Sequence, residues 1–144
     1  MKNLPIIITD ADALVALAVE EDSNHIRTKE LLIQLISRNA IIITPISAFA
    51  EAVTLLKWKL QKPELSQDLI DQCKRGALPV VGIDNDVNTI ALDFFKSNDS
   101  KGNTYFDAII AAVAKKYNAT AIFSFDSWYK KKGYTLAEEW VKGH

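Results

Sequence analysis

The sequence predicts an α/β fold built on a mainly parallel sheet. Short β-branched runs alternate with longer apolar or amphipathic segments along the 144 residues, which is typical of repeated strand–helix units. The runs themselves are almost wholly apolar, as strands covered by helices on both faces are. A chain of this length usually forms one core, so we expect a single domain over residues 1–144.

The composition excludes some classes of function. With 49% hydrophobic and 24% charged residues, the chain has the balance of a soluble globular protein. Its net charge of −1 counts against binding nucleic acid by electrostatics alone, but not against an enzyme that meets phosphates through metal ions. A single cysteine, Cys73, excludes an intrachain disulfide and fits a reducing compartment. No apolar run suits a membrane span or a signal peptide, so we expect a cytoplasmic protein.

The first predicted strand is Ile6–Thr9, a β-branched run closed by Asp10. A strongly apolar helix follows over Ala13–Val19, with Asp12 just before it. Asp10 can be simply the helix N-cap, because Asp is a favoured capping residue. It can also be a functional carboxylate at the end of a buried strand, and this block alone leaves both interpretations open.

A second helix is predicted from Ser23 or Asn24 to about Arg38. We expect its apolar set to be Ile26, Leu32, Ile33, Leu35 and Ile36. The second strand is predicted over Ala40–Ile43, where Thr44-Pro45 breaks it.

The next helix is predicted over Ile46–Leu60 and carries Glu51. The row of side chains around Glu51 consists of Ser47, Ala48, Leu55 and Trp58. This row is more apolar than a solvated helix face usually is. Glu51 is therefore either an ordinary boundary residue or a second functional carboxylate.

The middle of the chain says less about function. We expect a short helix over Ser66–Lys74, a third strand over Pro79–Ile83 and a helix capped by Asp84. Ser97–Asn103 is a polar loop, and such loops border active sites in α/β folds.

The stretch Thr104–Asp126 predicts a helix, a turn and a strand, with one carboxylate near the helix start and another at the strand end. Asp107 is the only polar residue within Phe106–Ala114, so it lies on a largely buried helix. Asn118 suits a left-handed C-cap, and Thr120–Phe125 is expected as the strand. The alternative is that both aspartates serve only local structure, in the helix dipole and a turn.

Beyond Asp126 we expect a short helix over Ser127–Lys132, an edge strand over Tyr134–Leu136 and a polar tail over Ala137–His144. The run Lys130–Lys132 is either a solvated charge run or a contact for a phosphate backbone.

Parallel strands and the helices that follow them bring their functional ends to one edge of a sheet. The candidate acids that map to this edge are Asp10, Glu51, Asp107 and Asp126. Two carboxylates about 4 Å apart repel by roughly 4 kcal/mol at an effective dielectric near 20, so such a cluster needs protons or cations. Oxygen ligands suit Mg²⁺ or Mn²⁺, which bind phosphodiesters and lower the pKa of water. No competing nucleophile–histidine pair is evident, because His25 and His144 are poorly placed.

In this order the blocks resemble the PIN domain, the ribonuclease fold used by VapC-like toxins of bacterial and archaeal toxin–antitoxin pairs. IIITDADALVAL resembles the family's strand–Asp–helix opening, and ITPISAFAEAVTLL resembles its second block. TYFDAIIAAVAKKYNATAIFSFD resembles the third and fourth blocks. Each block alone is weakly specific, whereas all of them in order, over essentially the whole chain, form a much stronger signal.

The resemblance implies four or five parallel strands between layers of helices and an endoribonuclease that depends on Mg²⁺ or Mn²⁺. It also implies a homodimer and an antitoxin partner. Asp10, Glu51 and Asp107 would be the core metal ligands, and Asp126 a ligand or a water-orienting residue. Asp12 departs from the family pattern, where Ser or Asn is commoner, and its extra charge would change the affinity for metal. Ser124 stands where Thr is commoner.

Two other interpretations stay open. IIITDADALV also resembles the opening of phosphotransferases of the haloacid dehalogenase type, with Asp10 as nucleophile and Asp12 as acid/base. The chain is short for that fold, and Glu51 and Asp107 would have no role in it. The chain could instead be a partner-binding scaffold without catalysis, and the absence of divalent-ion binding would favour that interpretation.

Overall fold

The computed structural model, which describes residues 3–97 and 102–144, has a parallel sheet at its centre. Within the described residues the sheet has four strands in the order β3-β2-β1-β4. Their bounds are β1 Ile6–Thr9, β2 Ile41–Pro45, β3 Val80–Val81 and β4 Ala121–Phe123. The predicted α/β class with a mainly parallel sheet is confirmed.

The first strand has the predicted bounds, whereas the others differ. β2 continues through Pro45, which the sequence places beyond the strand. β3 covers only part of Pro79–Ile83. β4 ends at Phe123, because the Phe125 N–H leaves the sheet and donates to Asp12 Oδ2 at 2.9 Å.

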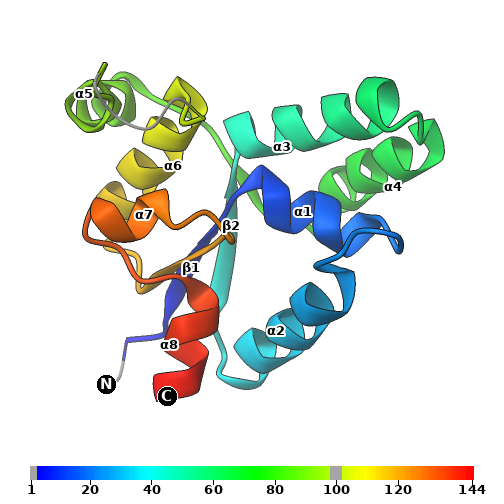
Figure 1. Cartoon of the computed structure of the whole chain (residues 1–144), viewed down its shortest axis with the longest axis horizontal. Coiled ribbons are helices and arrows are strands. Elements are labelled where there is room, and N and C mark those ends of the chain that lie inside the picture. The colour runs from blue at the N-terminus through cyan, green and yellow to red at the C-terminus, as the bar shows by residue number, and fades with distance from the viewer. Residues whose placement is uncertain (1–2, 98–101) are drawn as a thin grey trace.

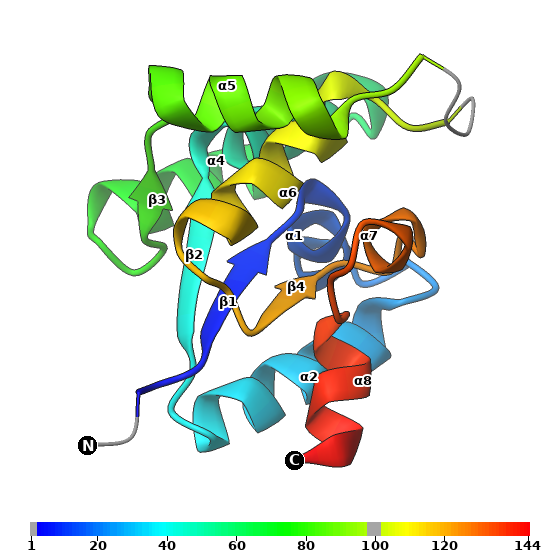
Figure 2. The ribbon, with the colours of Figure 1, turned by 90° about the vertical axis from the view of Figure 1, so that its left-hand side faces the viewer.

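Helices cover both faces of this sheet, as the two ribbon views show (Figures 1 and 2). Their bounds are α1 Ala11–Ala18, α2 His25–Ser37, α3 Ile46–Thr54, the π-helix η1 Leu55–Lys59, α4 Pro63–Lys74, α5 Asn85–Phe94, α6 Tyr105–Lys116, α7 Trp128–Lys131 and α8 Ala137–Gly143. Ile8 of β1 packs with α5 and α6, and Ile7 packs with α2 and α8 on the opposite face. This alternation follows from the two-residue period of strand side chains.

The apolar face predicted for α2 is partly wrong. Thr28, Leu31 and Leu35 are the buried residues of this helix. Ile26, Ile33 and Ile36, by contrast, are 72%, 65% and 60% exposed. Thr28, Leu31 and Leu35 follow the spacing of one helix face and pack toward the sheet, so the three isoleucines lie on other faces of the helix.

The helix predicted over Ile46–Leu60 changes its hydrogen-bond register midway. α3 ends at Thr54 and η1 continues to Lys59, with the Leu60 N–H donating to the Leu55 carbonyl oxygen at 2.9 Å. This five-residue step differs from the α-helical bonds before it. Ala52 of α3 and Leu56 of η1 are both buried.

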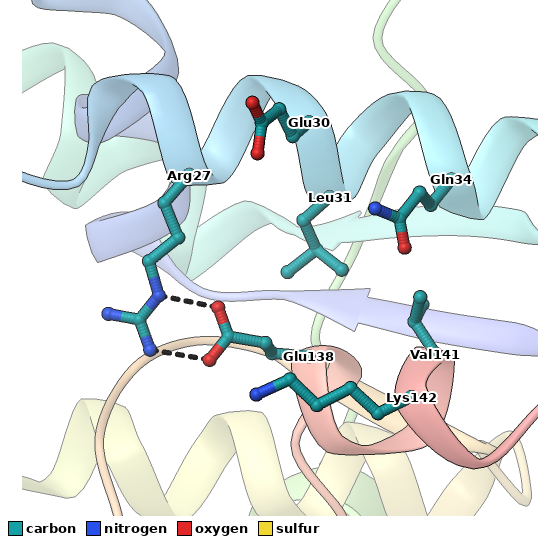
Figure 3. A pocket seen from close by; sticks show the side chains of 7 residues that line it. All are labelled: Arg27, Glu30, Leu31, Gln34, Glu138, Val141 and Lys142. Carbon is teal, nitrogen blue, oxygen red and sulfur yellow. Dashed lines mark hydrogen bonds and ion pairs between the residues drawn. The ribbon is translucent and has the colours of Figure 1, made fainter.

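The C-terminal segment was predicted as a polar tail, and this prediction is wrong. Residues 137–143 form α8, whose Ala137 and Val141 are buried in the core shared with β1, β4 and α2. Glu138 of α8 accepts two hydrogen bonds from Arg27 of α2, at 2.5 and 2.6 Å, beside a surface pocket of about 200 Å³ (Figure 3). The predicted edge strand Tyr134–Leu136 contributes only an isolated bridge from Leu136 to Ile122.

Two of the middle helices follow familiar rules for their first residues. α4 begins at Pro63, earlier than predicted, because proline suits the first helical position. Asp84 caps α5 as predicted, accepting from the Val87 N–H at 2.9 Å. The predicted loop Ser97–Asn103 lies mostly outside the described residues. In the part of the chain that is described, no helix is long and apolar enough to cross a membrane.

Candidate active site

The candidate site begins where β1 and β4 end side by side. Their parallel register pairs Thr9 with Phe123, and the Asp10 N–H donates to the Phe123 carbonyl oxygen at 3.1 Å. Asp10 and Ser124, the next residue on each strand, therefore lie at the same edge of the sheet. This edge is where ligands bind in parallel α/β folds.

Asp10 uses its two carboxylate oxygens differently. Oδ1 accepts from the Ala11 N–H at 2.7 Å and caps α1, which therefore starts earlier than the predicted Ala13. Oδ2 accepts a hydrogen bond from the Tyr129 hydroxyl at 2.6 Å. The N-cap that the sequence offered as the alternative role of Asp10 is thus present, and the second oxygen remains available to the Tyr129 hydroxyl.

Tyr129 links Asp10 to Asp107, and sequence reasoning missed it. The same hydroxyl that donates to Asp10 lies 3.4 Å from Asp107 Oδ1. The sequence predicted a short helix here, and α7 is present, but nothing in the pattern predicted this contact. The available signal is a tyrosine one turn beyond Asp126, on the helix that follows the last strand end.

Asp107 and Asp126 meet through one amide. The Asn103 side chain donates to Asp107 Oδ2 at 3.2 Å and to Asp126 Oδ2 at 3.3 Å. Asp107 also accepts from the Thr104 N–H at 2.9 Å in the capping box of α6, and Asp126 Oδ1 accepts from the Trp128 N–H at 2.9 Å. Both aspartates therefore serve local structure and still converge, as the sequence predicted.

Asp12 joins this group as a fifth acid. Its Oδ2 accepts from the Ser124 hydroxyl and from the Phe125 N–H, both at 2.9 Å. Glu51 of α3 is half-buried and close enough for Asp107 and Asp12 to raise its pKa. The structure therefore brings all four predicted acids together and adds Asp12, which the sequence analysis did not count among the acids of the PIN-like site.

The acids of the site disturb one another's titration. Burial, followed by the charge of Asp12 and a smaller effect of Asp107, raises the pKa of Asp10 to about 8. Burial and then the charge of Asp126 raise the pKa of Asp12. For Glu51, partial burial is the largest cause of the raised pKa, ahead of the charges of Asp107 and Asp12. Ionising these acids together is therefore costly, and a bound cation would stabilise their charged forms.

Two lysines of the basic run Lys130–Lys132 contact other side chains of the protein. Lys130 forms an ion pair with Glu139 of α8 at 2.7 Å, and the Lys132 ammonium lies 5.2 Å from the centre of the Trp128 ring. Both lysines therefore have partners within the protein, which neither a solvated charge run nor a phosphate contact predicts.

Comparison with known proteins gives the family. A PIN domain family model matches residues 7–133. The chain belongs to the PIN domain family. This assignment favours the PIN interpretation of the opening block over the phosphotransferase one.

Solved structures share this PIN fold. The crystal structure of Mycobacterium tuberculosis VapC20, described as a toxin that cleaves the sarcin–ricin loop, matches with a TM-score of 0.77 and 19% identity, over 90% of this chain and 96% of that one. The crystal structure of VapBC2 from Rickettsia felis, bound to a DNA fragment from its promoter, matches with a TM-score of 0.64 and 18% identity. The match covers 91% of this chain and 96% of that one. No curated protein sequence matches.

The donor atoms of this PIN domain suit a hard divalent cation, although they are not arranged as a finished metal site. Among the described residues, no three Asp, Glu, His or Cys side chains are placed so that they could hold a metal ion as they stand. The acids of the cluster nevertheless offer only oxygen donors, which Mg²⁺ and Mn²⁺ prefer. The raised pKa values of Asp10, Asp12 and Glu51 mark charge that a cation would neutralise. The residues therefore fit such an ion chemically.

Proposed function

We propose that this PIN domain, acting as one domain over residues 1–144, is a divalent-metal-dependent endoribonuclease that hydrolyses RNA phosphodiester bonds. The observation that carries the proposal is the convergence on one edge of the sheet of acids that follow β1 and β4 and acids of α3 and α6. Tyr129 links Asp10 to Asp107, Asn103 links Asp107 to Asp126, and the charges of Asp107 and Asp12 reach Glu51. We propose that the catalytic residues and metal ligands are Asp10, Glu51, Asp107 and Asp126.

A bound Mg²⁺ or Mn²⁺ would supply charge neutralisation for the phosphodiester and a more acidic water. The chain's own contribution is orientation. Asp10 is fixed through both oxygens, and Asp107 is fixed at the start of α6 by the Thr104 N–H. Asp126 is held by Asn103 and the Trp128 N–H, which suits a carboxylate that orients the attacking water.

The test is cleavage of a mixed RNA pool by the purified protein with Mn²⁺, with Mg²⁺ and with chelator, beside Asp10→Asn. We expect cleavage with either ion, none with chelator, and none by the variant. Cleavage that persists in chelator would contradict the metal dependence. A folded wild-type protein that cleaves no RNA under any condition and binds no Mn²⁺ in calorimetry would favour the scaffold interpretation.

We further propose that the protein acts in the cytoplasm as the toxin of a toxin–antitoxin pair, with an antitoxin as its protein partner. An apolar groove of about 450 Å³ supports a protein partner. It lies between α1, α2 and α4, and its lining includes Leu14, Leu32, Ile36, Leu69 and Leu78. We expect an apolar segment of the antitoxin to occupy it. Ile36→Glu should then abolish binding of a co-expressed antitoxin, whereas Ile33→Glu, on the same helix but outside the lining, should not.

A homodimer is the last part of the proposal. Exposed apolar side chains lie on α6 and on α3 and α5, the two helices that contact it, namely Ile46, Leu92 and Phe106, with Phe95 directly after α5. Large apolar side chains exposed together are typical of a protein interface.

A further inference from the structure

Tyr129 belongs to the site without being an acid, and the sequence did not predict its contacts there. Its ring is completely buried and meets the Trp128 ring edge-on, with the ring centres 5.3 Å apart. Its carbonyl oxygen accepts from the N–H groups of Lys132 and Tyr134, each at 3.1 Å. Packing and backbone bonds therefore fix where the hydroxyl lies.

The hydroxyl carries one proton, so it can donate to only one of the two acids beside it. Asp10 Oδ2 is at 2.6 Å, a length typical of strong hydrogen bonds to a carboxylate, whereas Asp107 Oδ1 is at 3.4 Å. The proton therefore belongs to the bond with Asp10. Together with the Ala11 N–H on Oδ1, it gives each oxygen of Asp10 a donor and fixes the plane of the carboxylate.

Each carboxylate oxygen has two lone pairs, so a single donor on each still leaves acceptor capacity. Asp10 is only 8% exposed, and without the hydroxyl its Oδ2 would have to find another donor or rotate. A carboxylate free to rotate loses orientational entropy when it binds an ion, whereas one that is already fixed does not.

We propose that Tyr129 is a positioning residue: its hydroxyl holds the Asp10 carboxylate in the orientation from which it binds a divalent cation, and so raises the affinity of the site for that cation. This inference rests on the proposed function, because it takes Asp10 as a metal ligand. Hydrogen-bond partners behind metal ligands typically change metal affinity by about 10- to 100-fold.

The test compares Mn²⁺ binding by calorimetry in the wild type, in Tyr129→Phe and in Tyr134→Phe. Tyr134→Phe is the matched control, because it makes the same substitution at a half-buried tyrosine that packs on Phe94. We expect Tyr129→Phe to bind Mn²⁺ about 10-fold more weakly and the control to bind like the wild type. RNA cleavage by Tyr129→Phe should fall at low Mn²⁺ and recover at saturating Mn²⁺, which damage to the fold would not allow.

An affinity of Tyr129→Phe within twofold of the wild type would overturn the inference. Tighter binding would also overturn it, because the hydroxyl would then compete with the ion. Wild-type protein that binds no Mn²⁺ would instead contradict the proposed function, so the two failures are distinguishable.

A second measurement uses the wild type alone and does not depend on how the variant folds. A buried, hydrogen-bonded tyrosine hydroxyl proton exchanges slowly enough to be followed by proton NMR. We expect the Tyr129 hydroxyl resonance to persist when the protein is saturated with Mg²⁺. Its loss on saturation would show that the ion displaces the hydroxyl, and the inference would be wrong.

Discussion

The burial of Asp10 makes the stability of the folded protein depend on pH. Burial and the neighbouring Asp12 raise its pKa to about 8, from about 3.8 in an unfolded chain. Below both values the carboxyl is protonated in either state, and its contribution to stability is fully present. As the pH rises from about 4 to about 8, the unfolded chain releases the proton more readily, so the folded protein loses stability.

Asp10→Asn should remove this loss. Asparagine still caps a helix and can accept from Tyr129, but it carries no charge. In chelator, we expect the melting temperature of the variant to exceed that of the wild type by several degrees at pH 8.5, with the difference shrinking toward pH 5. Thermal melts across this range, read by circular dichroism, provide the measurement. A difference in melting temperature that does not depend on pH would contradict the raised pKa of Asp10.

The charge of Asp12 helps to raise the pKa of Asp10, and this gives a second prediction. Metal ligands must be deprotonated, so Mn²⁺ affinity should rise with pH up to about 8, where Asp10 is ionised. Asp12→Asn removes the largest charge effect on Asp10 and lowers its pKa, so the rise should be complete at a lower pH. Calorimetric titrations between pH 6 and 9 measure the shift. Asp68→Asn, an exposed acid on α4, is the control, and an equal shift in both variants would contradict the prediction.

The sequence predicted the acids of this site but not the groups between them. Asp10 and Asp126 follow strands and Asp107 starts a helix, so the edge rule of parallel sheets was enough to bring them together. Asn103 and Tyr129 could not be predicted, because their contacts depend on the path of a loop and on the direction of the short helix α7. The contact of Asp12 with Ser124 could not be predicted either, because 112 residues separate them in the sequence.

At the scale of elements, α8 is held on α2 more by apolar packing than by its ion pair. The side chains of Arg27 and Glu138 are 49% and 26% exposed, so solvent screens their attraction. Glu138→Gln should cost less than about 1 kcal/mol of stability. Leu35→Ala, at a completely buried position of α2, should cost about 2–5 kcal/mol. Urea denaturation measures both, and a larger cost for Glu138→Gln would reverse this ranking.

The elements that the sequence missed are those whose stability comes from packing. The segment 137–143 is too short to be a stable helix alone, and it folds because Ala137 and Val141 enter the core below β4. The π-helix η1 is a change of hydrogen-bond register, which leaves no trace in the hydrophobic pattern. Hydrophobicity alone predicts that the isoleucines of α2 are buried, but they are exposed, because packing decides which apolar side chains face the core.

At the scale of the whole molecule, the exposed apolar residues of α3, α5 and α6 lead to the last prediction. Phe106 is 51% exposed at the start of α6, one residue before Asp107, so a dimer through this surface would bring a second copy close to the acids. Phe106→Asp should convert the proposed dimer to a monomer, because it places a charge in an interface that must exclude water. Ile26→Asp, at an apolar position of α2 that is 72% exposed, is the matched control. Gel filtration with light scattering gives the mass of each variant. A wild type that is monomeric would contradict the dimer itself, and a dimeric Phe106→Asp would place its interface elsewhere.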